Sequence, residues 1–408
     1  MSDDDRDPYD PKALRAVRWL ALLCVVLVTH GSLYPWQFAW PQSLSAAWDH
    51  MMNQRSWWTG LGDVVGNVVL FMPVGVLGWA LLRRSPMAVL LRLAWVIGVG
   101  VAFAFALQVV QIFVPARDAV WSDVVWNTLG LLLGLLLAVP ASRLPMGRLS
   151  AQQLRLPLTF VALWLLLQWW PLVPRLDWQQ IKDALKPLLL HPQWKTTTAL
   201  DAGLSLGLLG TLLRPLRRRE LWLVALPLAA GCGALIVEGQ WLSVSRSVGW
   251  LCGLLLAWAS WRMPARAAAM LGALIAFLWF TFDELRPFEF GESLGEFHWM
   301  PFAAQLQGSL SANTLALTWQ LFWLGVVMVL LHDIGARASA LALALGLWTL
   351  MLELLQTLLP SRVADITPAL LPWLWCVALP LLQVSFQGPV TKSVRRVQIN
   401  PPETRPLT

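Results

Sequence analysis

The sequence predicts an all-α, polytopic integral membrane protein of about twelve transmembrane helices arranged in three four-helix modules. Of its 408 residues, 57% are hydrophobic and 13% are charged, and the mean hydropathy is +0.60. Soluble domains carry roughly 45–50% apolar and about 25% charged residues. The apolar residues also fall into separate blocks, and a helix of about 20 residues crosses a bilayer. These observations exclude a secreted domain, a cytosolic enzyme and a nucleic-acid-binding protein, despite the net charge of +7.

Polar stretches separate the apolar blocks, and each block is a candidate span. The twelve candidates are residues 14–32, 63–82, 91–114, 121–139, 157–173, 199–213, 221–241, 247–261, 267–282, 314–331, 338–358 and 367–386. The acidic residues 1–12 and the Pro-rich residues 388–408 are predicted to be disordered ends. No cleavable signal peptide is expected. The first apolar block is long, follows an acidic start and lacks a small-residue cleavage site.

The distribution of basic residues predicts the orientation. With twelve spans, both termini lie on one side, and 21 of the 30 Lys and Arg residues then fall on that side. Short cytoplasmic loops carry an excess of Lys and Arg. We therefore expect both termini to be cytoplasmic.

The chain repeats a short polar motif, which divides it into modules. LQVVQIFVPAR (Leu107–Arg117) matches LELLQTLLPSR (Leu352–Arg362), and in both a Gln precedes an Arg by six residues. Gln240 and Arg246 form a third, weaker copy with the same spacing. Upstream, YPWQF matches RPFEF at residues 34–38 and 286–290. The predicted modules are residues 13–145, 155–262 and 266–386.

These motifs carry a resemblance to a known family. DVVGNVVLFMPVG (Asp63–Gly75) and LQVVQIFVPARDAVWSDVVWNTLGLLLG (Leu107–Gly134) closely resemble the VanZ-like family. Residues 284–380 look like a second copy, and the middle module resembles a degenerate relative. The resemblance implies a bacterial cell-envelope protein in the cytoplasmic (inner) membrane.

The two better copies depart from the family pattern in different places. The first has Gln108 where the family usually has Glu. It keeps an acid at Asp123, whereas the third copy keeps one at Asp365 and lacks the family's Asn-Thr-x-Gly. A near-complete family site therefore fits only the first and third modules.

Polar residues gather at the predicted outer helix ends and form the candidate site. They are Asp63, Gln111, Arg117 and Asp123 in the first module and Glu353, Gln356, Arg362 and Asp365 in the third. An Arg beside Gln and carboxylates can hold a phosphate or carboxylate with paired hydrogen bonds. The ligand would be an envelope lipid or a lipid-linked glycan. The alternative is structural: a buried cluster of Arg, Gln and carboxylates that holds the third helix of a module to the fourth.

No cofactor, metal site or catalytic group is predicted. The five His residues are scattered without metal-ligand spacing. The first functional hypothesis is a non-enzymatic protein that binds or organises envelope lipids at the outer face. The alternatives are a transporter or flippase, because transporters contain internal repeats, and a membrane enzyme acting on a lipid-linked substrate.

Three local features complete the predictions. Gly130 and Gly134 are expected at a close helix crossing, because small residues join helices in lipid. Residues 174–198 are expected to include an interfacial helix. The acidic stretch 283–296 is interpreted as a solvated outer loop.

Overall fold

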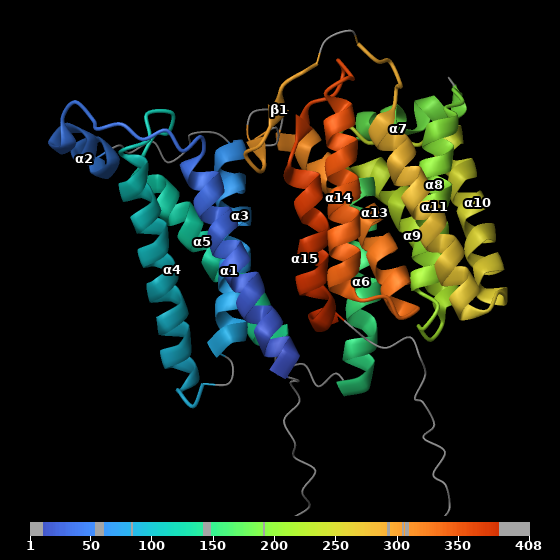
Figure 1. Cartoon of the computed structure of the whole chain (residues 1–408), viewed down its shortest axis with the longest axis horizontal. Helices are drawn as coiled ribbons and strands as arrows, with labels where there is room; N and C mark the ends of the chain where they lie inside the picture. Colours follow the sequence, from blue (N-terminus) through green and yellow to red (C-terminus); the bar gives the residue numbers. More distant parts are fainter. Residues whose placement is uncertain are drawn as a thin grey trace, which may run out of the picture.

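The computed structural model describes residues 11–53, 61–82, 85–141, 148–190, 192–291, 294–303, 306 and 310–382. In these ranges the chain forms fourteen helices and two strands of two residues each. Figure 1 shows the long helices standing roughly parallel to one another. The predicted all-α class is confirmed.

The helices follow the predicted spans closely. The long ones are α1 (Pro11–Leu33), α3 (Leu61–Leu82), α4 (Val89–Gln111), α5 (Trp121–Ala141), α6 (Arg148–Trp169), α8 (Thr196–Leu212), α9 (Arg219–Ile236), α10 (Val244–Arg262), α11 (Ala265–Leu285), α13 (Leu310–Asp333), α14 (Ala338–Gln356) and α15 (Thr367–Leu382). Each coincides with one predicted span. Two shorter helices, α2 (Leu44–Asn53) and α7 (Trp178–Leu189), lie between spans, and α7 falls within the predicted helical segment 174–198.

The long helices include several that suit a bilayer. Among the described residues, six helices are long and apolar enough to cross one: α4, α5, α9, α11, α13 and α14. The helices α1, α3, α6 and α15 each contain a shorter apolar stretch of 10–17 residues. The protein is therefore a multi-pass membrane protein, while twelve crossings in three modules remain a prediction.

The connections lie at two ends of the bundle. Pro11 and Leu382 lie at the same end, which is at the bottom of Figure 1. We call the opposite end the distal side: α1, α6 and α11 end there, and α8 and α10 begin there. The strands β1 (Phe297–His298) and β2 (Ala364–Asp365) pair in parallel on the distal side. Cytoplasmic termini would place the distal side outside the cell.

Two helix pairs cross closely enough to require glycine. A Cβ on Gly134 of α5 would lie 2.1 Å from the carbonyl oxygen of Met72, and one on Gly130 would lie 2.2 Å from that of Val68. A Cβ on Gly249 of α10 would lie 2.4 Å from the carbonyl oxygen of Ala199 in α8. The close packing predicted for Gly130 and Gly134 is confirmed, and α8 and α10 of the middle module cross in a similar way.

The apolar core is divided unequally along the chain. One large cluster joins the middle and third modules and includes Trp164, Leu206, Phe280, Trp323 and Trp375. The first module has two smaller clusters of its own. It touches the third module through α1 and α15 and through a 2.6 Å hydrogen bond between His30 Nε2 and the carbonyl of Pro301.

Candidate functional site

Arg117 holds the turn that follows α1. Its Nε donates to the carbonyl of Tyr34 and its Nη2 to the carbonyl of Gly31, both at 2.8 Å. Burial lowers the pKa of the guanidinium, and the charges of Tyr34 and Asp123 oppose that shift. Arginine remains charged despite such a shift. Two of its donor groups are therefore engaged by backbone oxygens.

Arg362 makes the same contacts in the third module. Its Nε donates to the carbonyl of Arg286 at 3.0 Å, and its Nη2 donates to the carbonyl of Asp283. The acceptors are again the last residue before a proline and the residue three positions earlier. A carbonyl at a helix end lacks an intrahelical donor, and a charged side chain can satisfy it. Arg117 and Arg362 thus donate to carbonyls at the ends of α1 and α11.

The turns after α1, α6 and α11 share one local conformation. Each contains a cis proline bond, at Pro35, Pro171 and Pro287. The residue after each proline has a φ of 63–66°. That residue also donates its backbone N–H to the carbonyl three positions before it, at 2.8–3.0 Å. We call these segments the proline turns. They lie on the distal side, and the turns at Pro35 and Pro287 are the two that the sequence comparison matched.

The glutamine of each motif also contacts its proline turn. Gln111 Nε2 donates to the carbonyl of Ser32 at 2.8 Å. Gln356 Nε2 donates to the carbonyl of Glu284 at 3.1 Å and to its side-chain oxygen at 2.8 Å. Both glutamines are buried. In the first and third modules, Gln and Arg together fasten the turn to the third long helix.

A second buried position links the third long helix to the segment that follows it. The Oε1 atom of Gln108 accepts from the backbone N–H of Val120 at 3.0 Å. In the third module, Glu353 Oε2 accepts from the backbone N–H of Asp365 at 3.0 Å. Gln108 stands where the third module has Glu353, and it makes the equivalent backbone contact. The substitution therefore preserves the connection.

The acids that follow each Arg have separate environments. Asp123 Oδ2 lies 3.5 Å from Gln108 Nε2. Asp365 is 2% exposed and its Oδ1 accepts from the backbone N–H of Thr367 at 2.6 Å, while no described residue bonds its buried Oδ2. Asp63 lies in the first turn of α3, and its side chain is outside the described part of the structure.

Glu284 and Gln320 belong to the site, although neither is among the predicted site residues. The prediction of a solvated acidic loop over residues 283–296 is wrong for Glu284. It belongs to α11, is 5% exposed, and accepts from Gln320 at 2.9 Å as well as from Gln356. The available signal was its position three residues before Pro287, which matches Ser32 before Pro35. Two amide donors stabilise this buried carboxyl group.

In the middle module, the glutamine and not the arginine of the motif contacts the proline turn. Gln240 Nε2 donates to the carbonyl of Trp170, the residue before Pro171. That carbonyl corresponds to those of Tyr34 and Arg286, which accept from arginine in the other modules. Gln240 lies four residues before α10, as Arg117 lies four residues before α5, so it holds the structural place of that arginine. Arg246 lies in the first turn of α10, and its Nη1 donates to the carbonyl of Trp241 at 3.3 Å. Among the described residues, Arg246 makes no hydrogen bond to a proline turn.

A second device holds the middle module's distal connections. Gln180 of α7 is 5% exposed, and its Nε2 donates to the carbonyls of Val237 at 2.8 Å and Gln240 at 3.2 Å. Leu242 donates its backbone N–H to the carbonyl of Ala184 at 2.9 Å. Glu238 lies 3.5 Å from Arg175 in an exposed ion pair. The helix α7 thus braces the segment that leads to Arg246.

Within the described ranges, no group of three or more His, Cys, Asp or Glu residues is arranged to hold a metal ion. The site predicted for the first and third modules consists of two separate sets, one in each module. Both sets contact backbone atoms of their own module.

Comparison with known proteins finds a family match that covers the first of these sets. Residues 19–143 match the VanZ/LLP1 family. The matched segment contains Arg117, Gln111, Asp123 and Asp63. No curated protein and no solved structure matches the chain significantly.

Proposed function

We propose that this membrane protein, which is VanZ-like over residues 19–143, binds anionic headgroups of envelope lipids or lipid-linked glycans at its outer face. The distal side is the outer face in this proposal, because the excess of Lys and Arg lies on the side of the termini. The ligand would be held by the middle module.

The position of Arg246 is the observation that carries this proposal, because its side chain lines a pocket and bonds the carbonyl of Trp241 instead of a proline turn. In the other two modules the arginine six residues after the motif glutamine donates twice to backbone carbonyls of a proline turn. In the middle module, Gln240 and Gln180 make the structural contacts instead. Arg246 keeps a planar set of donors, which suits a phosphate or carboxylate group. The ligand-binding role predicted for Arg117 and Arg362 therefore moves to Arg246.

Two alternatives from the sequence have less support. A transporter usually places its ligand groups near the bilayer midplane. The buried carboxyl groups of Asp201, Glu284 and Glu353 instead lie within about two turns of the distal helix ends. An enzyme would need acids and arginines from different modules in one cavity, whereas the hydrogen bonds described for Arg117, Arg246 and Arg362 stay within single modules.

Native mass spectrometry of protein extracted with its lipids tests the proposal. We expect the wild type to retain a defined anionic lipid or lipid-linked glycan and Arg246→Gln to lose it. Arg262→Gln is the matched control, because Arg262 lies at the other end of the same helix and stacks on Trp258. Equal lipid retention by all three proteins, with equal thermal stability, would reject the proposal.

A further inference from the structure

A polar pocket opens beside Arg246, and it has a volume of about 380 Å³. It lies where α8 and α10 begin and where α7 ends. Its lining consists of Lys186, Pro187, Gln193, Lys195, Thr198, Trp241, Ser243, Ser245 and Arg246. We propose that this pocket binds a phosphate-bearing group, either a phosphomonoester or a diphosphate. This inference rests on the proposed function and names the ligand class of the same site.

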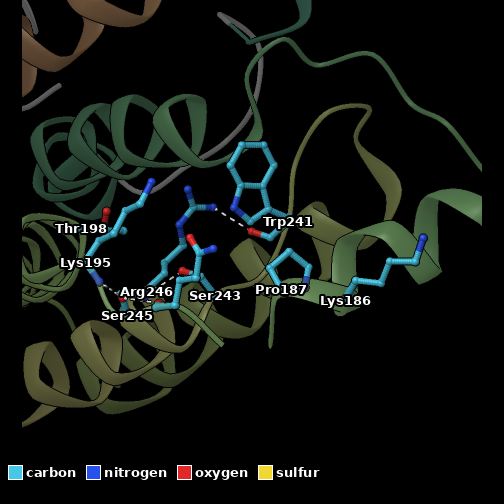
Figure 2. A pocket seen from close by; sticks show the side chains of 9 residues that line it. Lys186, Pro187, Lys195, Thr198, Trp241, Ser243, Ser245 and Arg246 are labelled. Carbon is cyan, nitrogen blue, oxygen red and sulfur yellow. Dashed lines mark hydrogen bonds between the residues drawn. The ribbon is translucent and has the colours of Figure 1, made fainter. Parts of the chain in front are cut away.

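The charges of the pocket favour a multiply charged anion. Three cations line it, and none of the lining residues is acidic. Figure 2 shows Arg246 and Lys195 extending toward the same side of the pocket, while Lys186 points away from them beyond Pro187. Lys186 also donates to Asp183 at 2.5 Å, and both side chains are about half exposed. Arg246 and Lys195 are therefore the principal anion-binding groups, with Lys186 at the rim.

The nearest buried carboxyl group is already satisfied by other donors. Asp201 of α8 lies one turn below Thr198, and its Oδ1 accepts from the indoles of Trp279 and Trp319 at 3.0 Å each. Arg246 forms no ion pair within the described part of the chain, although it feels the charge of Asp201. An anion in the pocket would give the guanidinium a direct partner.

The backbone around the pocket adds two helix N-termini. The residue before α8 is Lys195, whose side chain makes no capping hydrogen bond. The residue before α10 is Ser243, whose hydroxyl accepts from the backbone N–H of Arg246 at 3.2 Å. Helix N-termini attract anions through their free N–H groups and the helix dipole. Here they reinforce the two cations, since Lys195 and Arg246 lie at these same ends.

Buried hydrogen bonds hold the pocket in shape. The hydroxyl of Ser245, a residue 1% exposed, accepts from the backbone N–H of Lys195 at 2.7 Å and donates to the carbonyl of Gln193 at 3.2 Å. This serine ties the segment before α8 to the first turn of α10. The backbone segments that carry Lys195 and Arg246 are consequently positioned before any ligand arrives. Such preorganisation reduces the cost of ordering the site.

The ligand class follows from fork geometry, charge and size together. A guanidinium matches the paired oxygens of phosphate, and lysine adds a compact positive charge. A pocket of this volume also accommodates more than one small anion, because small-molecule sites begin at about 300 Å³. A diphosphate, or a phosphate together with the next group of a headgroup, fits these conditions.

The test separates phosphate from carboxylate and lipid from free anion. Nanodiscs of phosphatidylcholine would contain equal small amounts of phosphatidic acid and oleic acid, and native mass spectrometry would count the retained molecules. Calorimetric titrations in detergent would use inorganic pyrophosphate and acetate. We expect phosphatidic acid and pyrophosphate to bind in preference to oleic acid and acetate. We expect Arg246→Gln and Lys195→Gln each to weaken that binding about tenfold or more, as loss of a charged hydrogen bond does.

Lys182→Gln is the matched control, because Lys182 lies on α7 outside the pocket and against Trp178. Its affinities should equal those of the wild type. Pyrophosphate binding without retention of phosphatidic acid would identify a free phosphate compound as the ligand. Equal, Arg246-dependent retention of both lipids would overturn the phosphate inference and leave the proposed function standing. Retention independent of Arg246 and Lys195, in folded variants, would overturn both.

Discussion

The first and third modules differ from the middle one in what their motif arginine contacts. Arg117 and Arg362 each donate to two backbone carbonyls of a proline turn. Arg246 donates to the carbonyl of Trp241, and Gln240 has taken over the proline turn. The same pair of residues, six apart, therefore supports a turn in two modules and faces a pocket in the third. Two residues with the same spacing in sequence can thus take different places relative to the helices, and with them different contacts.

The largest effect should come from the glycine crossings, which the first and middle modules share. Gly134→Ala places a Cβ about 2.1 Å from the oxygen of Met72, and Gly249→Ala places one about 2.4 Å from that of Ala199. Because backbone atoms cannot move aside cheaply, we expect each variant to lose about 3 kcal/mol or more, or to fail to fold. Thermal unfolding in detergent measures this. Gly98→Ala is the control, since its Cβ meets nothing within 4 Å. Wild-type stability in Gly134→Ala would contradict the close crossing.

The next largest effect should be a loss of stability that distinguishes the first and third modules from the middle one. Arg117→Met and Arg362→Met each leave two carbonyls of a proline turn without their arginine donor, so we expect a loss of about 1–3 kcal/mol per carbonyl that becomes unsatisfied. Arg246→Met removes no contact to a proline turn and should change stability by less than about 1 kcal/mol. Thermal unfolding of the three variants under identical conditions compares them. An equally large loss in Arg246→Met would show that the middle arginine is structural as well.

A smaller effect should distinguish the first module from the third. Glu284→Leu removes the acceptor of Gln320 and Gln356 and should lower stability by about 1–3 kcal/mol, whereas Glu284→Gln keeps an oxygen acceptor and should lower it less. Ser32→Ala is the control in the first module, because Gln111 contacts only the backbone there. Thermal unfolding again provides the measurement. If Glu284→Leu and Ser32→Ala behaved alike, the carboxyl group would have no structural role.

Much of the fold could be predicted, because apolar blocks and short polar connections record helix positions directly. The repeat also located the proline turns through Tyr34 and Arg286. The partners of the arginines could not be predicted, because every residue has a backbone carbonyl and the sequence does not indicate which carbonyls lie near an arginine. Glu284 was misassigned because it lies among acidic residues, and its burial depends on Gln320, a residue distant along the chain. The pocket depends on Lys195 and Arg246, which are 51 positions apart and become neighbours only when α8 packs on α10.

The smallest expected effect concerns α7, the brace found in the middle module. Asp177 accepts from the backbone N–H of Gln180 at 2.6 Å and from Arg175, and these bonds hold the pKa of its carboxyl group below the ordinary value. A depressed pKa means that the ionised carboxylate stabilises the helix above the ordinary pKa, and that this contribution disappears as the pH falls through the folded pKa.

We therefore expect hydrogen exchange at the first turn of α7 to be unchanged between pH 7 and pH 5, after correction for intrinsic rates, and to accelerate below about pH 4. Asp177→Ala should show the faster exchange already at pH 7, whereas Asp177→Asn, which can still cap the helix, should not. Acceleration in Asp177→Ala confined to α7 would make the brace a local device; if the exchange also rose around Lys195 and Arg246, α7 would be setting the shape of the pocket itself.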